Sequence, residues 1–285
     1  MNPFPILLDA TALSALDPNA TLILDCRFDL ADPTRGERDW QQGHLPGARY
    51  ANLDRDLSDV SRPGLGRHPL PDAEAFARSL ARWGWTRGRH VVAYDDNGGA
   101  LAAARAWWLL RLVGIEASVL DGGWNAWRAA GLPVAAGEPE PAATSTPTLH
   151  FDTEQVLYYE AFERLRAQPG TLLLDARAAP RYRGEVEPLD ARAGHVPGAR
   201  NRPFADNLDA AGCFKSAAVL RAEYAALLGG RDPRAVIHMC GSGVTAAHNL
   251  LAMEIAGLHG SRLFAPSWSG WSSDPSRPLA TGEEA

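Results

Sequence analysis

A thiol stands in this 285-residue chain at a point where the backbone could make its sulfur reactive. Cys240 follows the apolar stretch 235–239, which predicts a buried strand, and the loop 241–245 leads into an Ala/Leu-rich stretch that predicts a helix over 246–257. Between a strand end and a helix start, backbone N–H groups and the positive end of the helix favour a thiolate and other anionic sulfur species. Glycines at positions 241 and 243 allow the backbone to turn such N–H groups inward. The sequence therefore predicts sulfur chemistry at Cys240.

The composition limits the partners that this cysteine could serve. A hydrophobic fraction of 46% and a formal net charge of −6 are ordinary for a soluble protein and argue against nucleic acid or an anionic membrane as the main partner. The cysteines Cys26, Cys213 and Cys240 form no CxxC pair, which indicates a reducing compartment, the cytoplasm, and no zinc site. The most apolar segment, 100–112, is interrupted by two arginines. We expect no secretory signal, no membrane span and no metal, nucleotide or flavin cofactor, and we expect local cations to bind any anionic substrate.

The chain repeats itself at an offset of about 150 residues, read directly from matching stretches in the same order. The matched stretches are Leu22–Arg27 with Leu172–Arg177, Gly43–Arg49 with Gly194–Arg200, Val91–Asp95 with Val236–Cys240, and Trp124–Trp127 with Trp268–Trp271. We therefore predict a duplicated domain, with residues 1–135 as the first copy, 136–150 as a Pro/Ala/Thr-rich linker and 151–285 as the second copy.

In each copy, short apolar runs alternate with helix-like stretches. This alternation predicts an α/β fold: two tandem domains, each a small parallel sheet with helices on both faces. In such sheets ligands bind at the carboxyl ends of the strands, where Cys240 is expected.

The duplication also separates chemistry from folding. Asp95 stands in the first copy where Cys240 stands in the second, so we expect the first domain to be catalytically silent. Features that both copies share are better explained by structure, so we interpret His44 and His195 as hydrogen-bonded loop residues and the tryptophan pairs as core. Cys26 has no thiol counterpart in the second copy and is predicted to lie in the core.

Together these residues resemble the two-domain rhodanese superfamily over almost the whole chain. Further support comes from the Gly-His-Leu/Val-Pro-Gly-Ala motif in both halves and the closing stretch 267–271 with 277–279. The loop at Cys240 is similar to that of the 3-mercaptopyruvate sulfurtransferases, whereas thiosulfate-specific rhodaneses usually place a cationic pair directly after the cysteine, where this chain has Gly241 and Ser242. The resemblance implies a silent first domain, a catalytic second domain and an active site at their interface.

The resemblance also implies residues that bind the substrate. The first substrate arginine of the family matches Arg181, and the second is expected at Leu189, so we expect Arg192 to replace it through a small loop shift. The loop residues implied to cradle the substrate sulfur are Gly241, Gly243, Val244 and Thr245.

A second group of residues is implied to move protons. The interface aspartate and histidine of the family match Asp54 and His68, and Ser242 matches a loop serine that assists proton movement. The chain departs from the family at Ala265-Pro266, before Ser267, where a glycine is usual.

These residues favour one reaction among several. A thiolate at Cys240 would take sulfur from a donor as a persulfide and pass it to a thiol or cyanide, which implies ping-pong kinetics. The donor 3-mercaptopyruvate is favoured because its single carboxylate suits an arginine such as Arg181, and because its departing enolate needs a proton that Ser242 could relay. Thiosulfate is the alternative donor. The acceptor implied by the resemblance is a thioredoxin-like protein or a small thiol.

Other classes of protein remain as alternatives. A sulfur carrier would load Cys240 from another protein without catalytic turnover, and a structural scaffold would not need Cys240 at all. A cysteine phosphatase needs an arginine six residues after the cysteine, and that position is Ala246.

Overall fold

The computed structural model describes residues 4–139 and 144–283, and the chain divides into two compact units. The first unit comprises Met1–Asp59, Leu70–Asp152 and Ala210–Phe214, and the second comprises Val60–Pro69, Thr153–Asp209 and Lys215–Ala285. The predicted domains had one boundary, in the stretch 136–150. In the structure the segment Val60–Pro69 belongs to the second unit, although residues of the first unit precede and follow it in sequence. The segment Ala210–Phe214 belongs to the first unit, although residues of the second unit precede and follow it.

Each unit is built on a five-stranded parallel sheet, and the two sheets have equivalent strand orders, β1-β5-β4-β2-β3 and β6-β10-β9-β7-β8. The elements of the first unit are β1 (Leu7–Leu8), α1 (Ala10–Ser14), β2 (Thr21–Asp25), α2 (Arg35–Gln42), β3 (Arg49–Tyr50), α3 (Ala73–Trp83), β4 (His90–Tyr94), α4 (Ala103–Leu112), β5 (Ala117–Leu120) and α5 (Gly123–Ala129). Those of the second are β6 (Val156–Leu157), α6 (Tyr159–Arg166), β7 (Leu172–Asp175), α7 (Ala179–Tyr182), β8 (Ala199–Asn201), α8 (Ala217–Leu228), β9 (Val236–Met239), α9 (Thr245–Ile255), β10 (Arg262–Phe264) and α10 (Ser267–Ser272). Single turns of 3-10 helix span Thr153–Gln155, Phe204–Asn207 and Pro233–Ala235. The predicted α/β fold is confirmed.

Local sequence explains where the outer helices begin and end. Helix α3 is capped at its N-terminus by Asp72, whose carboxylate accepts the Ala75 N–H, and is followed by Gly84 with φ +78°. Helix α8 is capped in the same way by Ser216, whose hydroxyl accepts the Val219 N–H, and it is also followed by a glycine in the left-handed region.

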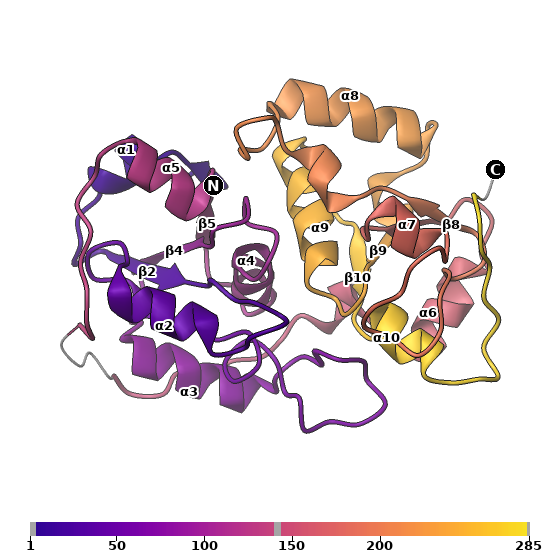
Figure 1. The fold of residues 1–285 in the computed structure, drawn as a ribbon, viewed down its shortest axis with the longest axis horizontal. Coiled ribbons are helices and arrows are strands. Elements are labelled where there is room, and N and C mark those ends of the chain that lie inside the picture. Colours follow the sequence, from indigo (N-terminus) through magenta and orange to yellow (C-terminus); the bar gives the residue numbers. More distant parts are fainter. Residues whose placement is uncertain (1–3, 140–143, 284–285) are drawn as a thin grey trace. The chain divides into compact units, whose positions relative to one another are not determined.

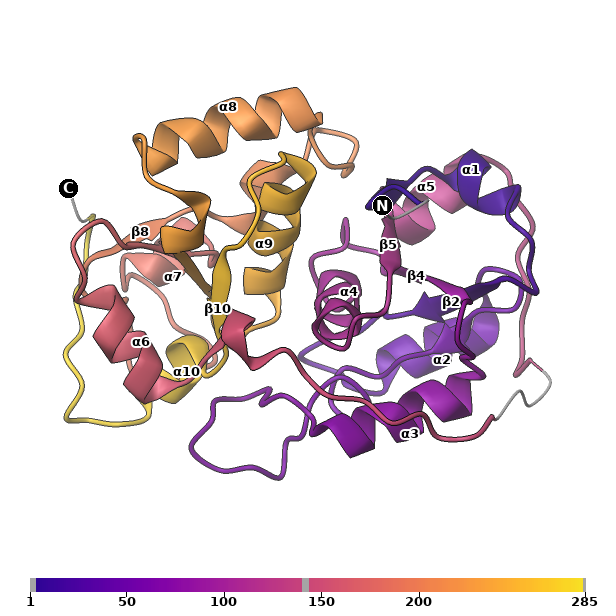
Figure 2. The ribbon, with the colours of Figure 1, turned by 180° about the vertical axis from the view of Figure 1, so that it is seen from behind.

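Strand β9 lies at the centre of the second sheet (Figure 1; its neighbours β10 and α9 are seen from behind in Figure 2), and all of its residues are buried. Ile237 and Met239 face a core shared with residues of α6, α7 and α10, whereas helix α9 packs on β9 and β10, with α8 against it. Because side chains alternate along a strand, every residue of β9 must be accommodated in a packed layer. This packing fixes the end of β9, from which Cys240 continues.

Of the tryptophans that the two copies share, Trp127, Trp268 and Trp271 are buried and Trp124 is partly buried. His44 and His195 are buried, and the Nδ1 atom of each lies 2.8 Å from a backbone carbonyl oxygen, of Trp40 and Tyr182 respectively. Cys26 is fully buried. Within the described ranges, no helix combines the length and the apolar character that crossing a membrane requires.

Candidate active site

The sulfur of Cys240 lies in the loop between β9 and α9. The Gly243 N–H donates to Cys240 Sγ at 3.2 Å, and Gly243 has φ +80°, a conformation that glycine adopts without strain. The helix that begins at Thr245 adds the positive end of its dipole. Gly241, Ser242 and Gly243 are all buried, and Cys240 is 2% exposed. The loop therefore places the Cys240 sulfur beside a fixed N–H donor, in a position that is almost inaccessible to water.

A second segment, residues 267–269, hydrogen-bonds to the backbone of this loop. The Cys240 N–H donates to Ser267 Oγ at 3.2 Å, and the Cys240 carbonyl accepts the Trp268 N–H at 2.9 Å. The Gly241 carbonyl accepts the Ser269 N–H at 2.8 Å. Ser267 has φ +51°, a strained backbone conformation for a residue other than glycine. Such a conformation persists only where the surrounding contacts hold it, and here the Ser267 hydroxyl accepts the Cys240 N–H.

The Val60–Pro69 segment packs against the same loop within the second unit. Tyr159 Oη donates to the Gly64 carbonyl at 2.6 Å, and the Arg67 N–H donates to Ser269 Oγ at 2.9 Å. Gly66 has φ +87°, and a Cβ there would lie 2.4 Å from the Pro266 carbonyl oxygen, so only glycine fits. These contacts fix the two side chains that follow, Arg67 and His68.

The structure brings His68 and Ser242 together. His68 Nδ1 lies 2.7 Å from Ser242 Oγ, a hydrogen-bonding distance, and both side chains are buried. Their segments are 174 residues apart in sequence. Such a pair can relay a proton to a group bound beside the cysteine.

Asp54 belongs to the first unit, where its N–H donates to Asn52 Oδ1 at 2.9 Å. Its role beside His68 and the predicted interface site remain predictions.

Two guanidinium groups approach the residue after the cysteine. A Cβ built on Gly241 would lie 3.3 Å from Arg67 Nη2 and 3.5 Å from Arg181 Nη1. Asp190 joins the two arginines, since its Oδ1 pairs with Arg67 Nη1 at 2.7 Å and its Oδ2 with Arg181 Nη2 at 3.3 Å. Glu187 Oε1 accepts a further bond of 2.6 Å from Arg181. Burial raises the pKa of Asp190, although the Arg67 guanidinium opposes this shift.

Arg192, by contrast, is engaged elsewhere. Its guanidinium donates at 2.7 to 3.5 Å to the backbone carbonyls of Ser272, the last residue of α10, and of Asp274, Pro275 and Arg277, which follow it. Its own carbonyl accepts the Trp268 Nε1–H at 3.0 Å. Leu189 is 44% exposed. The structure thus brings Arg181 and the unpredicted Arg67 to Gly241, and gives Arg192 a role in holding the chain after α10.

A third arginine behind the loop is structural. Arg177 makes a forked pair with Asp175, the closest contact being 2.7 Å, and its guanidinium lies 4.7 Å from the centroid of a Trp268 ring. The first unit repeats the arrangement, with Arg27 for Arg177, Asp25 for Asp175 and Trp124 for Trp268. Because the copy that has Asp95 in place of Cys240 contains the same cluster, we interpret this cluster as structural, holding the strand ends.

The equivalent loop of the first unit is filled by its own side chain. The carboxylate of Asp95 accepts five backbone N–H groups at 2.8 to 3.2 Å, from Asn97, Gly99, Leu101, Ala102 and Ala103. Burial nevertheless raises the pKa of Asp95, against the lowering effect of these bonds. This loop therefore binds an anion that belongs to the chain itself, which explains why the first copy has no free cradle.

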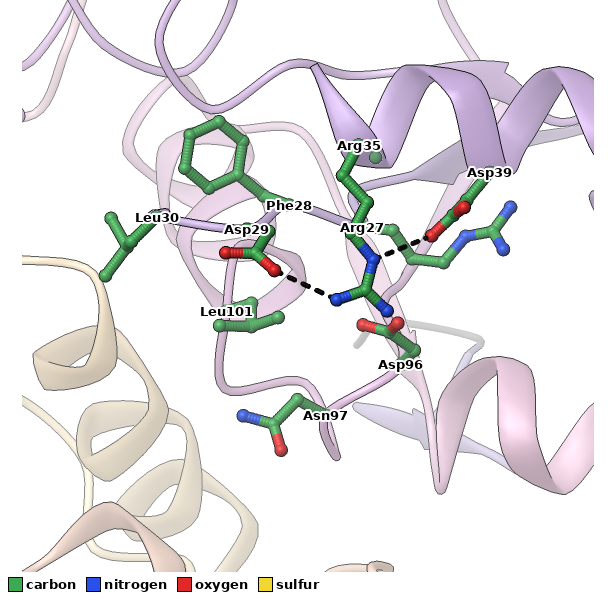
Figure 3. Close-up of a pocket in the computed structure, with 10 residues that line it drawn as sticks. Arg27, Phe28, Asp29, Leu30, Arg35, Asp39, Asp96, Asn97 and Leu101 are labelled. Atoms are coloured by element: carbon green, nitrogen blue, oxygen red, sulfur yellow. Dashed lines mark hydrogen bonds and ion pairs between the residues drawn. The ribbon is translucent and has the colours of Figure 1, made fainter. Parts of the chain in front are cut away.

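A pocket of about 430 Å³ lies beside that loop (Figure 3). Its cation Arg35 is paired with Asp29 at 2.9 Å and with Asp39 at 3.3 Å. Asp96 adds a third carboxylate, and Arg27, the other cation of the lining, is committed to its pair with Asp25. The pocket therefore lacks the free positive charge that an anionic sulfur donor needs.

The fold and the loop together define a tandem-domain α/β protein whose second domain holds a buried cysteine at the end of its central strand. The Rhodanese-like domain model matches residues 9–130 and 159–274. The chain belongs to the rhodanese family, and the predicted resemblance is confirmed.

The names of relatives that this chain matches over nearly their whole length include both donors. A "Probable 3-mercaptopyruvate sulfurtransferase" of Pseudomonas aeruginosa is 48% identical, over 97% of this chain and 98% of that protein. A "Putative thiosulfate sulfurtransferase" of Mycobacterium tuberculosis is 42% identical, over 96% of this chain and 94% of that protein. Among solved structures, the 3-mercaptopyruvate sulfurtransferase from Leishmania major superposes with a TM-score of 0.84 at 29% identity, over 95% of this chain and 75% of that one.

Proposed function

We propose that this chain transfers sulfur from 3-mercaptopyruvate to a thiol or cyanide through a persulfide on Cys240. The class of enzyme, a sulfurtransferase, follows from the family and from a relative of this name that matches over nearly the whole of both chains. The choice of donor rests on the site, because the relatives' names include both 3-mercaptopyruvate and thiosulfate.

The hydrogen-bonded pair of Ser242 and His68 carries the donor assignment. When the C–S bond of 3-mercaptopyruvate breaks, its electron pair stays on carbon as the enolate of pyruvate, which must gain a proton. Ser242 Oγ, on the loop of Cys240 and 2.7 Å from His68 Nδ1, can supply that proton and recover it through the histidine. Thiosulfate leaves as sulfite and needs no such group.

The charges beside the loop agree with a monoanionic donor. Three arginines (Arg67, Arg177 and Arg181) are matched by three carboxylates (Asp175, Glu187 and Asp190). A donor with one carboxylate can share the outer guanidinium N–H groups without leaving the cluster with a large excess charge.

The reaction then proceeds in two balanced steps. The Cys240 thiolate attacks the donor sulfur, the S–S bond forms, the C–S bond breaks and the departing carbon is protonated, so that pyruvate leaves. The outer sulfur is anionic and lies where the Gly243 N–H and the start of α9 stabilise it. An acceptor thiolate next attacks that outer sulfur and departs as a persulfide, which restores the Cys240 thiolate.

Thiosulfate is the second candidate donor, because the two guanidiniums at Gly241 could bind a dianion. For the acceptor we propose a thioredoxin-like protein or a small thiol, and for the compartment the cytoplasm, supported by three cysteines that form no disulfide. The same proposal includes a role for Asp54 in proton movement and a role for Val244 and Thr245 in binding the substrate sulfur. No cofactor is needed, and within the part of the chain that the structure describes no group of side chains is arranged to hold a metal ion.

The test measures pyruvate and sulfide release from 3-mercaptopyruvate with a thiol acceptor, beside thiosulfate-to-cyanide transfer, for the wild type and Cys240→Ser. A Cys240-dependent preference for 3-mercaptopyruvate supports the proposal. A preference for thiosulfate overturns the donor assignment, and stoichiometric sulfur loading without turnover indicates a carrier.

A further inference from the structure

His68 lies on a segment that has no secondary structure of its own to hold it. As the structure describes it, Val60–Pro69 contains neither helix nor strand, yet His68 is 3% exposed and its Nδ1 lies 2.7 Å from Ser242 Oγ. Segments of this kind are usually mobile, whereas a misplacement of about 1 Å can cost about 100-fold in rate. The position of His68 must therefore come from the surface against which the segment packs.

We propose that Gly66 and Gly270 are positioning residues of the reaction. Because neither has a side chain, the segment Val60–Pro69 comes close enough to α10 to set His68 Nδ1 against Ser242 Oγ. The inference rests on the proposed function for the identity of the donor, but the contact between His68 and Ser242 that it explains can be measured without turnover.

At Gly66 the segment meets the backbone at the start of α10. A Cβ on Gly66 would overlap the Pro266 carbonyl oxygen and would lie 3.0 Å from Ser269 Oγ. That hydroxyl is the atom that accepts the Arg67 N–H. Pro266 has φ −62°, which its ring fixes, so its carbonyl has little freedom to move away. Any side chain at position 66 would therefore displace the segment.

At Gly270 a second helix meets the same segment. A Cβ on Gly270 would lie 2.6 Å from Tyr159 Oη and 3.2 Å from the Gly66 nitrogen. Tyr159, the first residue of α6, donates its hydroxyl to the Gly64 carbonyl at 2.6 Å. The Arg277 guanidinium lies 3.6 Å from the centroid of the Tyr159 ring, a cation–π contact that holds the ring in place. Gly270 thus leaves the space in which the Tyr159 hydroxyl and the segment meet.

Both glycines act on the reaction through His68. A side chain at either glycine would push the segment away from α10, and Gly66 precedes His68 by only two residues. A shift of about 1 Å would lengthen the contact between His68 and Ser242 beyond about 3.5 Å, where a hydrogen bond is lost. Cys240 lies on another segment, the loop after β9, and would keep its sulfur chemistry. The loss should therefore fall on the step that needs a proton.

The experiment compares the rates at which Cys240 gains sulfur from 3-mercaptopyruvate and from inorganic polysulfide, followed by rapid-quench mass spectrometry. Attack on polysulfide breaks an S–S bond, and the shorter polysulfide leaves as an anion that needs no proton. We expect Gly66→Ala and Gly270→Ala to lower the ratio of the 3-mercaptopyruvate rate to the polysulfide rate by about 10-fold or more. Gly64→Ala is the matched control and should leave this ratio unchanged, because Gly64 also has a positive φ, +75°, but a Cβ there would meet no described atom within 4 Å.

A second measurement does not depend on the donor. In protein with isotope-labelled histidine, Ser242→Ala should shift the nitrogen NMR resonance of His68 Nδ1, because it removes the hydroxyl at 2.7 Å. In the Gly66→Ala variant the same replacement should cause no shift. His68→Gln assigns the resonance. In the His68→Gln variant, Gly66→Ala should have no further effect on the rate ratio, since both changes remove the same interaction.

The outcomes separate this inference from the proposed function. A wild type that gains sulfur only from polysulfide refutes the proposed donor but leaves the NMR comparison as the test of Gly66. The inference is refuted if Gly66→Ala keeps the shift that depends on Ser242. It is also refuted if the wild type uses 3-mercaptopyruvate and Gly66→Ala changes the rate ratio less than about twofold.

Circular dichroism and the polysulfide rate identify a misfolded variant. If both glycine variants misfold, Tyr159→Phe decides, because it removes one hydroxyl only. The loss of its bond to the Gly64 carbonyl should lower the rate ratio by about 2- to 10-fold and should reduce the NMR shift caused by Ser242→Ala. No change in either quantity refutes the inference.

Discussion

Replacing Ser242 with alanine should slow one donor and spare the other. The hydroxyl lies 2.7 Å from His68 Nδ1 in a buried setting, where water cannot easily substitute for it. A positioned proton donor contributes about 10²- to 10⁴-fold to a rate, so we expect Ser242→Ala to reduce sulfur transfer from 3-mercaptopyruvate by at least about 100-fold. Transfer from thiosulfate, whose leaving group needs no proton, should change less than about threefold.

The assay is rapid-quench mass spectrometry of the Cys240 persulfide with each donor, which isolates the first half-reaction. His68→Gln should reproduce the donor-specific loss. Ser261→Ala is the matched control, because Ser261 Oγ lies 3.2 Å from His238 Nε2 in another buried Ser–His pair of the same unit. Equal losses with both donors would refute the proton-relay argument and assign Ser242 to the shape of the loop.

Three further predictions concern the loops and the core. Asp95→Ala leaves five N–H groups without their acceptor and should lower the free energy of unfolding, measured by urea titration, by ~3–5 kcal/mol. Asp95→Asn should lower it less. A decrease below about 1 kcal/mol for Asp95→Ala would contradict the role given to this carboxylate. Burial lowers the pKa of His238 to about 3 in the folded protein, whereas the usual pKa of a histidine in an unfolded chain is about 6.5. Below about pH 6.5 the unfolded chain therefore binds a proton that the folded chain does not bind. The stability that is present above this pH is lost as the pH falls. At pH 5 this loss amounts to ~2 kcal/mol, and it should be absent from the pH 7-to-5 difference of His238→Gln. Gly241→Arg places a third cation against Arg67 and Arg181, and should reduce kcat/KM for 3-mercaptopyruvate by ~10-fold or more; an unchanged kcat/KM would contradict this expectation.

Local patterns were sufficient for the architecture. Apolar runs with turn residues at their ends predicted parallel strands, and the repeat predicted two equivalent sheets, because both signals depend on residues close together in sequence. The predicted helix over 246–257 is α9 at Thr245–Ile255, and the predicted strand 235–239 is β9 at Val236–Met239.

The positions of Arg67 and Arg192 depend on packing between segments far apart in sequence, which local patterns do not predict. Arg67 approaches Asp190 across 123 residues of sequence, and no composition shift marks Val60–Pro69 as a segment of the second unit. The nearness of Arg67 to His68 was the available signal, since the resemblance had already singled out the histidine. Arg192 was chosen for its position in sequence, but the backbone carbonyls that it binds, at the end of α10 and beyond, belong to residues 80 to 85 positions later.

The most direct test of the account is the mass of the protein after one exposure to 3-mercaptopyruvate without an acceptor. We predict that the wild type gains one sulfur atom, mapped to Cys240, and releases one equivalent of pyruvate, and that Cys240→Ser gains none. Sulfur mapped to Cys26 or Cys213, or pyruvate release by Cys240→Ser, would contradict the central claim.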